Sequence, residues 1–260
     1  MDQRNRLREA IEAGDVVFGA RAATAVPAVV ELYGVLGLDF VWLDFEHGGP
    51  SPWDAGVVAG LCRAAEVGGT ELLARLPSGD PALIRKVLDA GVRNVLVPRV
   101  DSAEEVRAAV EATRFVYEGA PGERGKAGGR ANAWGAADDY VATEDASVCL
   151  GVMIEKRSAI DALDDILAVP DLGFVFVGPS DLSVQLGHPT DKTHPDVVAQ
   201  VEAVHEACRA AGVPIGSLPH DPAKAIEAVA AGHQLLRIGG ELEAAKLTLT
   251  ARLDEIRAAR

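Results

Sequence analysis

Residues 41–49 read Val-Trp-Leu-Asp-Phe-Glu-His-Gly-Gly, an apolar run that ends abruptly in charged residues and glycine. Strands of a parallel sheet are buried on both faces, so they appear in a sequence as continuous apolar runs. Charged residues that end such a run lie at the carboxyl end of the strand, where α/β folds bind their ligands. Asp44, Glu46 and His47 therefore predict that this strand contributes to a functional site.

The same pattern, an apolar run followed by a helical segment, recurs along the whole chain. Strands are predicted at residues 16–19, 38–43, 71–75, 94–97, 148–154, 174–177, 213–216 and 234–238, and a closing helix at 241–259. Such alternation implies right-handed βαβ units and a parallel sheet. Eight units in a chain of about 250 residues predict a (β/α)8 TIM barrel. A doubly wound sheet is disfavoured because no G-x-G-x-x-G follows the first strand. No linker interrupts the pattern, so we expect residues 1–260 to form a single domain.

The composition excludes several classes of partner. The net charge of −14 disfavours both nucleic acid and anionic membrane surfaces as ligands. No apolar run approaches the roughly 20 residues that span a bilayer, and residues 1–14 are too polar for a signal peptide. The three cysteines are scattered without metal or redox spacing, which favours a reducing compartment. We expect a cytoplasmic protein.

Two carboxylates, Glu155 and Asp181, lie at the predicted ends of neighbouring strands. They would repel each other unless one is protonated or a cation lies between them. Two carboxylates with water and substrate oxygens are typical of magnesium and manganese sites. The alternatives are a metal-free acid–base pair, or an Asp181 that merely caps a short helix.

Arg75 and His47 complete the set of candidate residues at the strand ends. The guanidinium of Arg75 suits a carboxylate or an enolate oxygen, and its alternative is a structural ion pair with Glu46 or Asp44. His47 is a candidate general base that Asp44 would orient, and its alternative is a structural histidine. Lys156 is the lysine nearest to a strand end, yet it does not end one cleanly. A Schiff-base mechanism is therefore disfavoured.

Residues 117–135 break the pattern with six glycines, two arginines and one lysine. Arg124, Lys126 and Arg130 would allow this loop to bind an anion. A long insertion in a compact domain is more often a lid or a contact between subunits. We favour a subunit contact.

Several segments together resemble the HpcH/HpaI aldolase family. They are residues 40–48 (FVWLDFEHG), 75–77 (RLP), 88–91 (LDAG), 96–98 (LVP), 122–125 (GERG), 154–155 (IE) and 178–183 (GPSDLS). The resemblance implies a barrel of the phosphoenolpyruvate/pyruvate-domain type. It also implies a class II pyruvate aldolase, of the kind that cleaves 4-hydroxy-2-oxoheptanedioate or 2-dehydro-3-deoxyglucarate.

The resemblance assigns roles to the strand-end residues. Glu155 and Asp181 would hold a divalent cation, Mg²⁺ or Mn²⁺, with Co²⁺ or Zn²⁺ as alternatives. Arg75 would stabilise the enolate oxygen of pyruvate, and the amides of Ser180 and Asp181, after Gly178, would bind its carboxylate. His47, oriented by Asp44, would move the proton of the C4 hydroxyl through a water molecule. Met153 and Lys156 depart from the family pattern, which affects substrate range more than chemistry.

The resemblance also implies an assembly. Asp89 would reach the site of a neighbouring subunit, and the last helix would be exchanged between subunits of a homohexamer, a trimer of dimers. Such oligomers are common in the family.

The expected activity is that of a carbon–carbon lyase. It would reversibly cleave a 4-hydroxy-2-oxo acid into pyruvate and an aldehyde, a hydroxy-aldehyde above all, through a metal-bound pyruvate enolate. The alternatives are a CoA-thioester lyase of the citrate lyase β or malyl-CoA lyase type, and a non-catalytic pyruvate-binding protein of the same fold.

Overall fold

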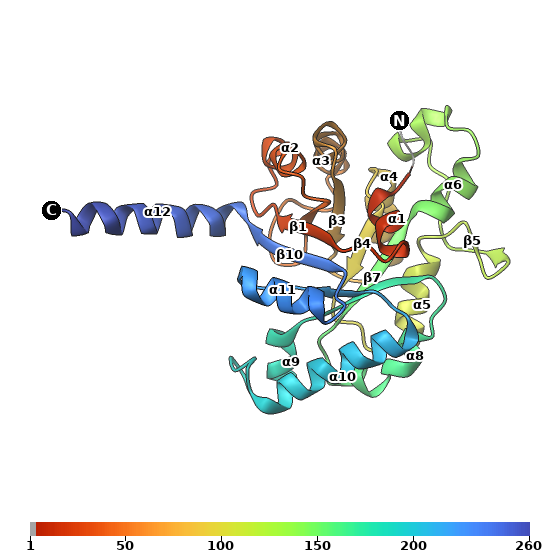
Figure 1. Ribbon diagram of the computed structural model, residues 1–260. Helices are drawn as coiled ribbons and strands as arrows, with labels where there is room; N and C mark the ends of the chain where they lie inside the picture. Colours follow the sequence, from red (N-terminus) through yellow and green to blue (C-terminus); the bar gives the residue numbers. More distant parts are fainter. Residues whose placement is uncertain (1–3) are drawn as a thin grey trace.

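The computed structural model describes residues 4–260, and within this range eight parallel strands close into a barrel (Figure 1). Around the barrel the strands follow the order β1-β10-β9-β8-β7-β4-β3-β2. Their bounds are β1 Val17–Arg21, β2 Phe40–Asp44, β3 Glu71–Arg75, β4 Asn94–Val97, β7 Cys149–Ile154, β8 Leu172–Val177, β9 Ile215–Ser217 and β10 Leu235–Gly240. The predicted (β/α)8 barrel is confirmed, and two strands, β3 and β4, have the predicted bounds.

Helices surround the barrel, except for α12, which projects from it. They are α1 Arg6–Glu12, α2 Pro27–Val35, α3 Ala55–Gly68, α4 Pro81–Asp89, α5 Ala103–Glu111, α6 Tyr140–Ser147, α7 Arg157–Asp161, α8 Leu163–Leu167, α9 Pro179–Gln185, α10 Pro195–Ala211, α11 Pro222–Ala230 and α12 Glu241–Ala258. The amphipathic pattern of residues 2–13 predicts a first helix, and this segment begins partly outside the described residues. The pattern of residues 159–168 predicts one helix, whereas the structure has α7 and α8 there, and the pattern does not predict α9. The 117–135 loop includes most of a hairpin, β5 Val116–Tyr117 with β6 Ala120–Pro121, and a short 3-10 helix at Arg130–Gly135.

Phenylalanine side chains fill the inside of the barrel opposite glycines of neighbouring strands. A Cβ atom on Gly19 would lie 2.3 Å from the Phe40 ring, and one on Gly151 would lie 2.1 Å from the Phe174 ring. Gly216 makes the same space for Phe176, whose ring packs edge-on against Trp42 with centroids 5.2 Å apart. The barrel therefore has a solid centre.

Alternation along the strands determines which side chains project from the carboxyl end. Successive residues of a strand point to opposite faces. Phe40 and Trp42 belong to the inner cluster, so the next residue of that face, Asp44, projects into the barrel mouth. By the same rule Arg75 follows Leu73, Glu155 follows Met153 and Arg237 follows Leu235. The carboxyl end of the barrel thus gathers charged side chains over an apolar centre.

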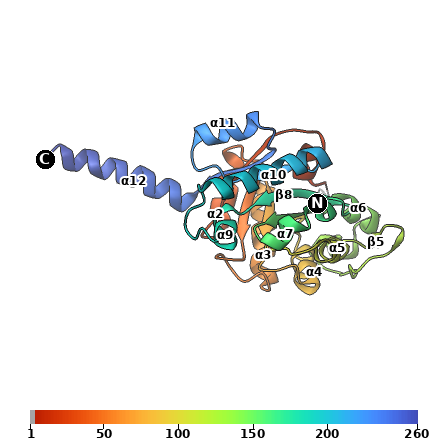
Figure 2. The same ribbon diagram turned by 90° about the horizontal axis from the view of Figure 1, so that it is seen from below.

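The last helix, α12, extends away from the barrel in both views (Figures 1 and 2). From Leu242 onward its side chains are exposed. Leu242, Leu249 and Ile256 are spaced by seven residues and form an apolar stripe that this chain does not cover. Within residues 4–260, no helix combines the length and the apolar character that crossing a bilayer requires.

Candidate active site

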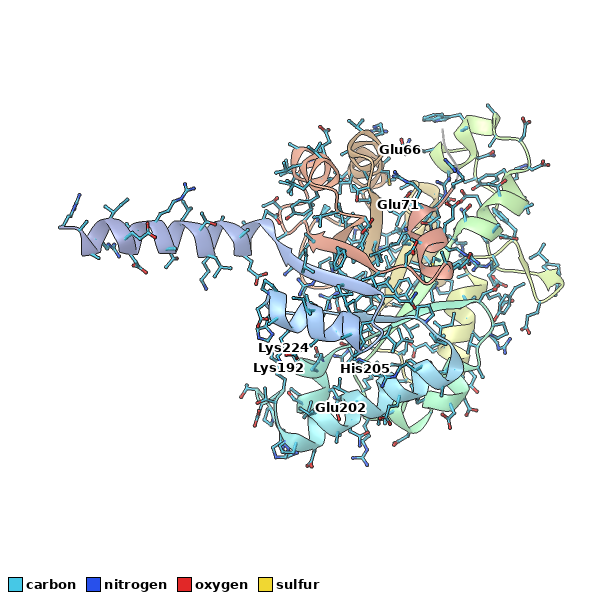
Figure 3. The ribbon with its side chains drawn as sticks, viewed as in Figure 1. Glu66, Glu71, Lys192, Glu202, His205 and Lys224 are labelled. Carbon is cyan, nitrogen blue, oxygen red and sulfur yellow. The ribbon has the colours of Figure 1, made fainter. Side chains whose placement is uncertain are left out.

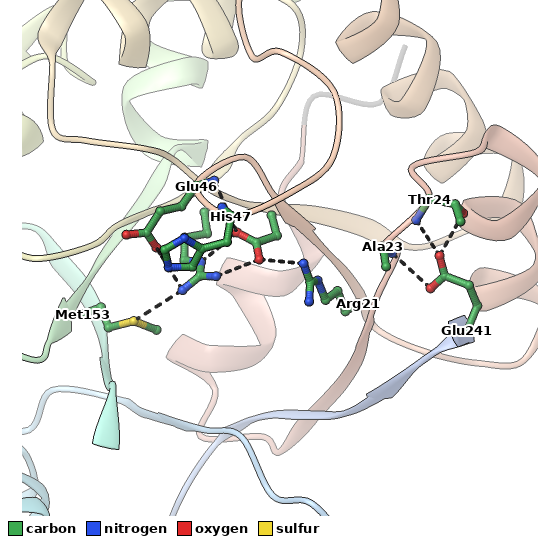
Figure 4. Close-up of polar contacts among 9 residues, drawn as sticks. Arg21, Ala23, Thr24, Glu46, His47, Met153 and Glu241 are labelled. Atoms are coloured by element: carbon green, nitrogen blue, oxygen red, sulfur yellow. Dashed lines mark hydrogen bonds and ion pairs between the residues drawn. The ribbon is translucent and has the colours of Figure 1, made fainter. Parts of the chain in front are cut away.

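Asp44 and Arg75 form the best-defined contact in the barrel mouth (Figure 4). Arg75 donates from Nε to Oδ1 at 3.0 Å and from Nη2 to Oδ2 at 2.7 Å. Arg21, at the end of β1, approaches the same Oδ2 to 3.0 Å. Burial of Asp44 opposes its ionisation, but the bonds and charges of these arginines, with the backbone N–H of His47, lower its pKa. Asp44 is therefore an ionised anchor that positions two cations.

Glu46 and His47 lie on the turn that follows β2. Oε2 of Glu46 lies 3.0 Å from Nη1 of Arg75 and 3.6 Å from Nε2 of His47. Burial raises the pKa of Glu46, and the charges of Asp44 and Asp181 add to that shift against the lowering effect of Arg75 and His47. The side chain of His47 is 62% exposed and borders the open mouth.

The expected contact between Asp44 and the His47 ring is absent from the described residues. Asp44 instead accepts the backbone N–H of His47, at 3.3 Å, because its carboxylate is already turned toward the arginines of β1 and β3. The ring of His47 is directed to Glu46 (Figure 4). The carboxylate that lies near the ring is thus Glu46, and Asp44 binds the backbone of the turn.

Glu155 is buried at the end of β7. Its Oε1 accepts the backbone N–H of Arg99 at 2.8 Å. Burial, followed by the charges of Glu46 and Asp181, raises the pKa of Glu155 to about 7. A Cβ atom at Gly178 would lie 2.3 Å from Oε2 of Glu155, so glycine is required at the end of β8 for this approach. Arg99 itself has a φ of 56°, a left-handed conformation that costs an L-residue roughly 1–2 kcal/mol.

Ser180 and Asp181 lie in the first turn of α9, directly after Gly178. The peptide N–H groups of a first turn have no partner within the helix, so they are free to face an anion. Oδ1 of Asp181 lies 3.5 Å from Nη1 of Arg99, and its side chain is partly exposed. Gly178 occupies the N-cap position, so Asp181 does not cap α9. Glu46, Glu155 and Asp181 thus form a cluster of three carboxylates beside Arg75 and Arg99.

Asp89 is separated from this cluster within one chain. It is the last residue of α4, whose carboxyl end lies at the amino end of the barrel. Burial raises its pKa, and Arg124, Lys86 and Glu144 are among its charged neighbours. A role for Asp89 at a neighbouring subunit's site stays a prediction.

The two arginines of the loop are paired inside the chain, whereas Lys126 is exposed. Arg124 is fully buried, donates to Glu144 at 2.7 Å and lies over the ring of Phe115. Arg130 pairs with Glu66 on α3. The loop is therefore anchored to the barrel through its arginines and does not present them to an anion. Lys156 pairs with Asp101, so it too is directed away from the carboxylate cluster.

Sequence reasoning overlooked Arg21, Arg99 and Arg237 as site residues. Arg21 and Arg99 lie at or just after the carboxyl ends of β1 and β4, so the same signal that identified Arg75 could have identified them. Arg237 lies inside β10, on the same face as the inward-pointing Leu235. Arg237 and Arg75 each lie over the Trp42 ring, with guanidinium carbons 5.8 and 5.7 Å from its centroid. Arg75 also contacts the sulfur of Met153 at 4.0 Å.

Comparison with known proteins places the chain in a family. The model of the HpcH/HpaI aldolase/citrate lyase family matches residues 19–246. The chain belongs to the HpcH/HpaI aldolase/citrate lyase family. It is 38% identical to the hydroxypyruvate/pyruvate aldolase of Roseovarius nubinhibens over 84% of each chain. It is 35% identical to the 2-keto-3-deoxy-L-rhamnonate aldolase of Salmonella gallinarum, over 90% of this chain and 86% of that one.

A solved structure agrees with this assignment to the family. An HpcH/HpaI aldolase/citrate lyase family protein from Burkholderia cenocepacia superposes with a TM-score of 0.91. That protein is 31% identical, and the match covers 97% of this chain and 99% of the other. The family resemblance read from the strand-end segments is therefore confirmed.

Proposed function

We propose that the protein is a divalent-metal-dependent aldolase, which reversibly cleaves a 4-hydroxy-2-oxo acid into pyruvate and an aldehyde. The observation that carries the proposal is the convergence of Glu46, Glu155 and Asp181 beside Arg75 in the barrel mouth. Retro-aldol cleavage needs a base for the hydroxyl proton and a positively charged site for the developing enolate. Both kinds of group are present here, and the relatives named as aldolases support this chemistry.

The carboxylate cluster fits a divalent cation. Burial raises the pKa of both Glu46 and Glu155, and the charge of Asp181 adds to each shift, so the cluster favours either a proton or a cation between its carboxylates. Glu155 and Asp181 would hold the ion through oxygen donors, which suit Mg²⁺ and Mn²⁺. When bound, the ion would polarise the keto group of pyruvate and favour its enolate.

Arg75 would hold the keto oxygen of pyruvate as negative charge develops on it. Its guanidinium is fixed in place by Asp44 and Glu46, so little reorganisation is needed in the transition state. The backbone amides of Ser180 and Asp181 would bind the pyruvate carboxylate. Both groups lie at the same end of the barrel.

His47 would accept the proton of the C4 hydroxyl during cleavage and return it during synthesis. Its exposed ring borders the mouth, where the aldehyde must enter and leave. Glu46, 3.6 Å from Nε2, would orient the ring. Asp44 acts on His47 through the backbone of the turn, so we treat Asp44 as a positioning residue.

We further propose that α12 is exchanged between subunits of a homo-oligomer, for which a hexamer is our hypothesis. Its uncovered leucines and isoleucine would be expensive to leave in water, at about 25 cal/mol per Å². The exposed apolar residues Leu32, Val35 and Leu36 at the end of α2 offer a matching surface on the barrel. The cytoplasm remains our predicted location.

Metal removal tests the central proposal. Pyruvate incubated in D₂O should lose its methyl protons in the presence of enzyme with Mn²⁺ or Mg²⁺. Treatment with EDTA should stop both this exchange and aldol cleavage, and added Mn²⁺ should restore them. Full activity in excess EDTA would show that the carboxylate cluster does not use a metal. Retro-cleavage of malyl-CoA at a comparable rate would instead favour the CoA-thioester lyase.

A further inference from the structure

We propose that Arg237 and Lys192 form an anion subsite beside the pyruvate site, so that the preferred aldehyde carries a carboxylate or a phosphate. This inference rests on the proposed aldolase function and adds the substrate class to it. It concerns the end of the aldehyde that is remote from the reacting carbon.

Arg237 is the cation in the mouth that lacks a carboxylate. Asp44 forms ion pairs with both Arg21 and Arg75, whereas no described carboxylate lies within ion-pair distance of Arg237. Its Nε is buried and has no hydrogen-bond acceptor among the described residues. The guanidinium rests over the Trp42 ring, on the inward face of β10. Burying a charged donor without a partner is costly, and an anionic ligand would remove that cost.

A cavity of about 290 Å³ lies directly against this guanidinium. Ser180 and Pro179 of α9 form one wall, and Ser217 at the end of β9 forms another. The hydroxyl of Ser217 is buried and has no partner among the described residues, so it is a second free donor. Ser180 also belongs to the proposed pyruvate site, so the cavity opens onto the place where the new bond is formed.

The charge of the cavity favours an anion. Lys192 and Arg237 supply two positive charges, and Glu243 at the start of α12 supplies one negative charge. His205, labelled with Lys192 in Figure 3, is neutral because burial lowers its pKa to about 4. His220 is exposed and lies 3.1 Å from Asp221, its neighbour in the chain. A carboxylate or phosphate would contact Arg237 through its guanidinium fork and Lys192 through its flexible ammonium.

Pairs of aldehydes that differ in charge and have the same number of carbon atoms test the subsite. Butanal is compared with succinic semialdehyde, and glyceraldehyde with glyceraldehyde 3-phosphate, each with pyruvate and Mn²⁺. The wild-type enzyme should prefer the anionic member of at least one pair, and which pair responds distinguishes a carboxylate from a phosphate. Arg237→Met should lower kcat/KM for that anionic aldehyde roughly 10–100-fold more than for its neutral partner. Arg237→Lys should retain part of the preference, and Lys192→Met should weaken it less.

The controls separate this inference from the proposed function. Arg209→Met makes the same chemical change at the far end of α10 and should leave the preference unchanged. Pyruvate exchange in D₂O involves no aldehyde, so wild-type exchange without any anionic preference overturns the subsite and leaves the aldolase intact. An Arg237→Met variant that weakens pyruvate binding in the exchange assay, and acts equally on both aldehydes, also overturns it. Absence of exchange in the wild type would instead contradict the proposed function.

Discussion

Asp44 holds Arg75 through two hydrogen bonds, Oδ1 to Nε and Oδ2 to Nη2, across neighbouring strands β2 and β3. The two residues are register partners in the sheet, so the backbone ladder itself fixes their separation. The guanidinium keeps Nη1 for other contacts, and it is this nitrogen that approaches Glu46. Arg75 is thus oriented before any substrate binds.

Replacing Arg75 by lysine should retain the charge and lose this orientation. We expect kcat for aldol cleavage to fall by about 10²–10³, the usual cost of removing one donor that stabilises an oxyanion. Arg75→Ala should abolish turnover. Thermal unfolding of both variants checks that the protein stays folded when Asp44 has only Arg21 as its ion-pair partner. Wild-type kcat in a folded Arg75→Lys protein would contradict the role of the guanidinium.

Replacing His47 by alanine should separate the two halves of the reaction. Cleavage and synthesis require the hydroxyl proton to move, whereas exchange of the pyruvate methyl protons does not. We therefore expect aldol cleavage to fall more than D₂O exchange in the same preparation. An equal loss of both rates would assign His47 to the pyruvate half of the site.

The raised pKa of Glu155 predicts an unusual pH dependence for the metal-free protein. Its pKa is about 7 in the folded chain, against about 4.3 in an unfolded one. Between these values the folded state binds a proton that the unfolded state has lost, so stability from this group is full below pH 4 and is lost as pH rises through 7.

Thermal unfolding in EDTA at pH 5.5 and pH 8 measures this effect. Between pH 5.5 and pH 8 we expect the Tm of the wild type to fall by a few degrees more than the Tm of Glu155→Gln, since the amide does not titrate. Mn²⁺ should remove the difference by replacing the proton. Identical pH profiles for the two proteins would show that Glu155 is not protonated near neutrality.

Gly178→Ala should disturb the metal site with little effect on the rest of the barrel. The added Cβ would lie 2.3 Å from Oε2 of Glu155, so this carboxylate would have to move. We expect Mn²⁺ affinity, measured by calorimetry, to fall by at least about tenfold, the low end for losing support around a ligand. Gly60→Ala on α3 is the matched control, because its Cβ would meet only the tip of Arg63, at 4.0 Å.

The apolar stripe of α12 predicts the behaviour of charged variants. Leu249→Glu combined with Ile256→Glu should lower the molar mass measured by light scattering, because the stripe could no longer be buried against a partner. The barrel should stay folded by circular dichroism, since these residues do not contact it. Exposed Lys246→Glu on the same helix is the control. A monomeric wild type would refute the exchange of this helix.

Much of the fold was predictable because each barrel strand is a short apolar run between helical segments. The bounds of β3 and β4 were predicted without error, since charged or polar residues delimit both runs. The predicted strands at 16–19 and 234–238 end before β1 and β10 do, because Arg21 and the glycines after Ile238 interrupt the apolar pattern. α9 was not predicted because it is only two turns long and begins at a proline in the Gly178–Asp181 turn.

The candidate site was only partly predictable for a related reason. Sequence position indicates which strand end bears a charged residue, and Asp44, Arg75 and Glu155 were identified in this way. It does not indicate how the charges are partnered across strands. The ring of His47 therefore lies beside Glu46 instead of Asp44, and the missing partner of Arg237 could be recognised only in three dimensions.

Glu241, the first residue of α12, connects this helix to the barrel. Glu241 accepts a hydrogen bond from the hydroxyl of Tyr33. It also accepts hydrogen bonds from the amides of Ala23 and Thr24 (Figure 4), so it joins the end of β10 to the segment after β1. These two strands are where the two ends of the sheet meet to close the barrel. A displacement of α12 would therefore also displace the paired strands β1 and β10, which carry Arg21 and Arg237. Subunit assembly and substrate preference would then be thermodynamically linked, because a neighbouring subunit would change the shape of the barrel mouth.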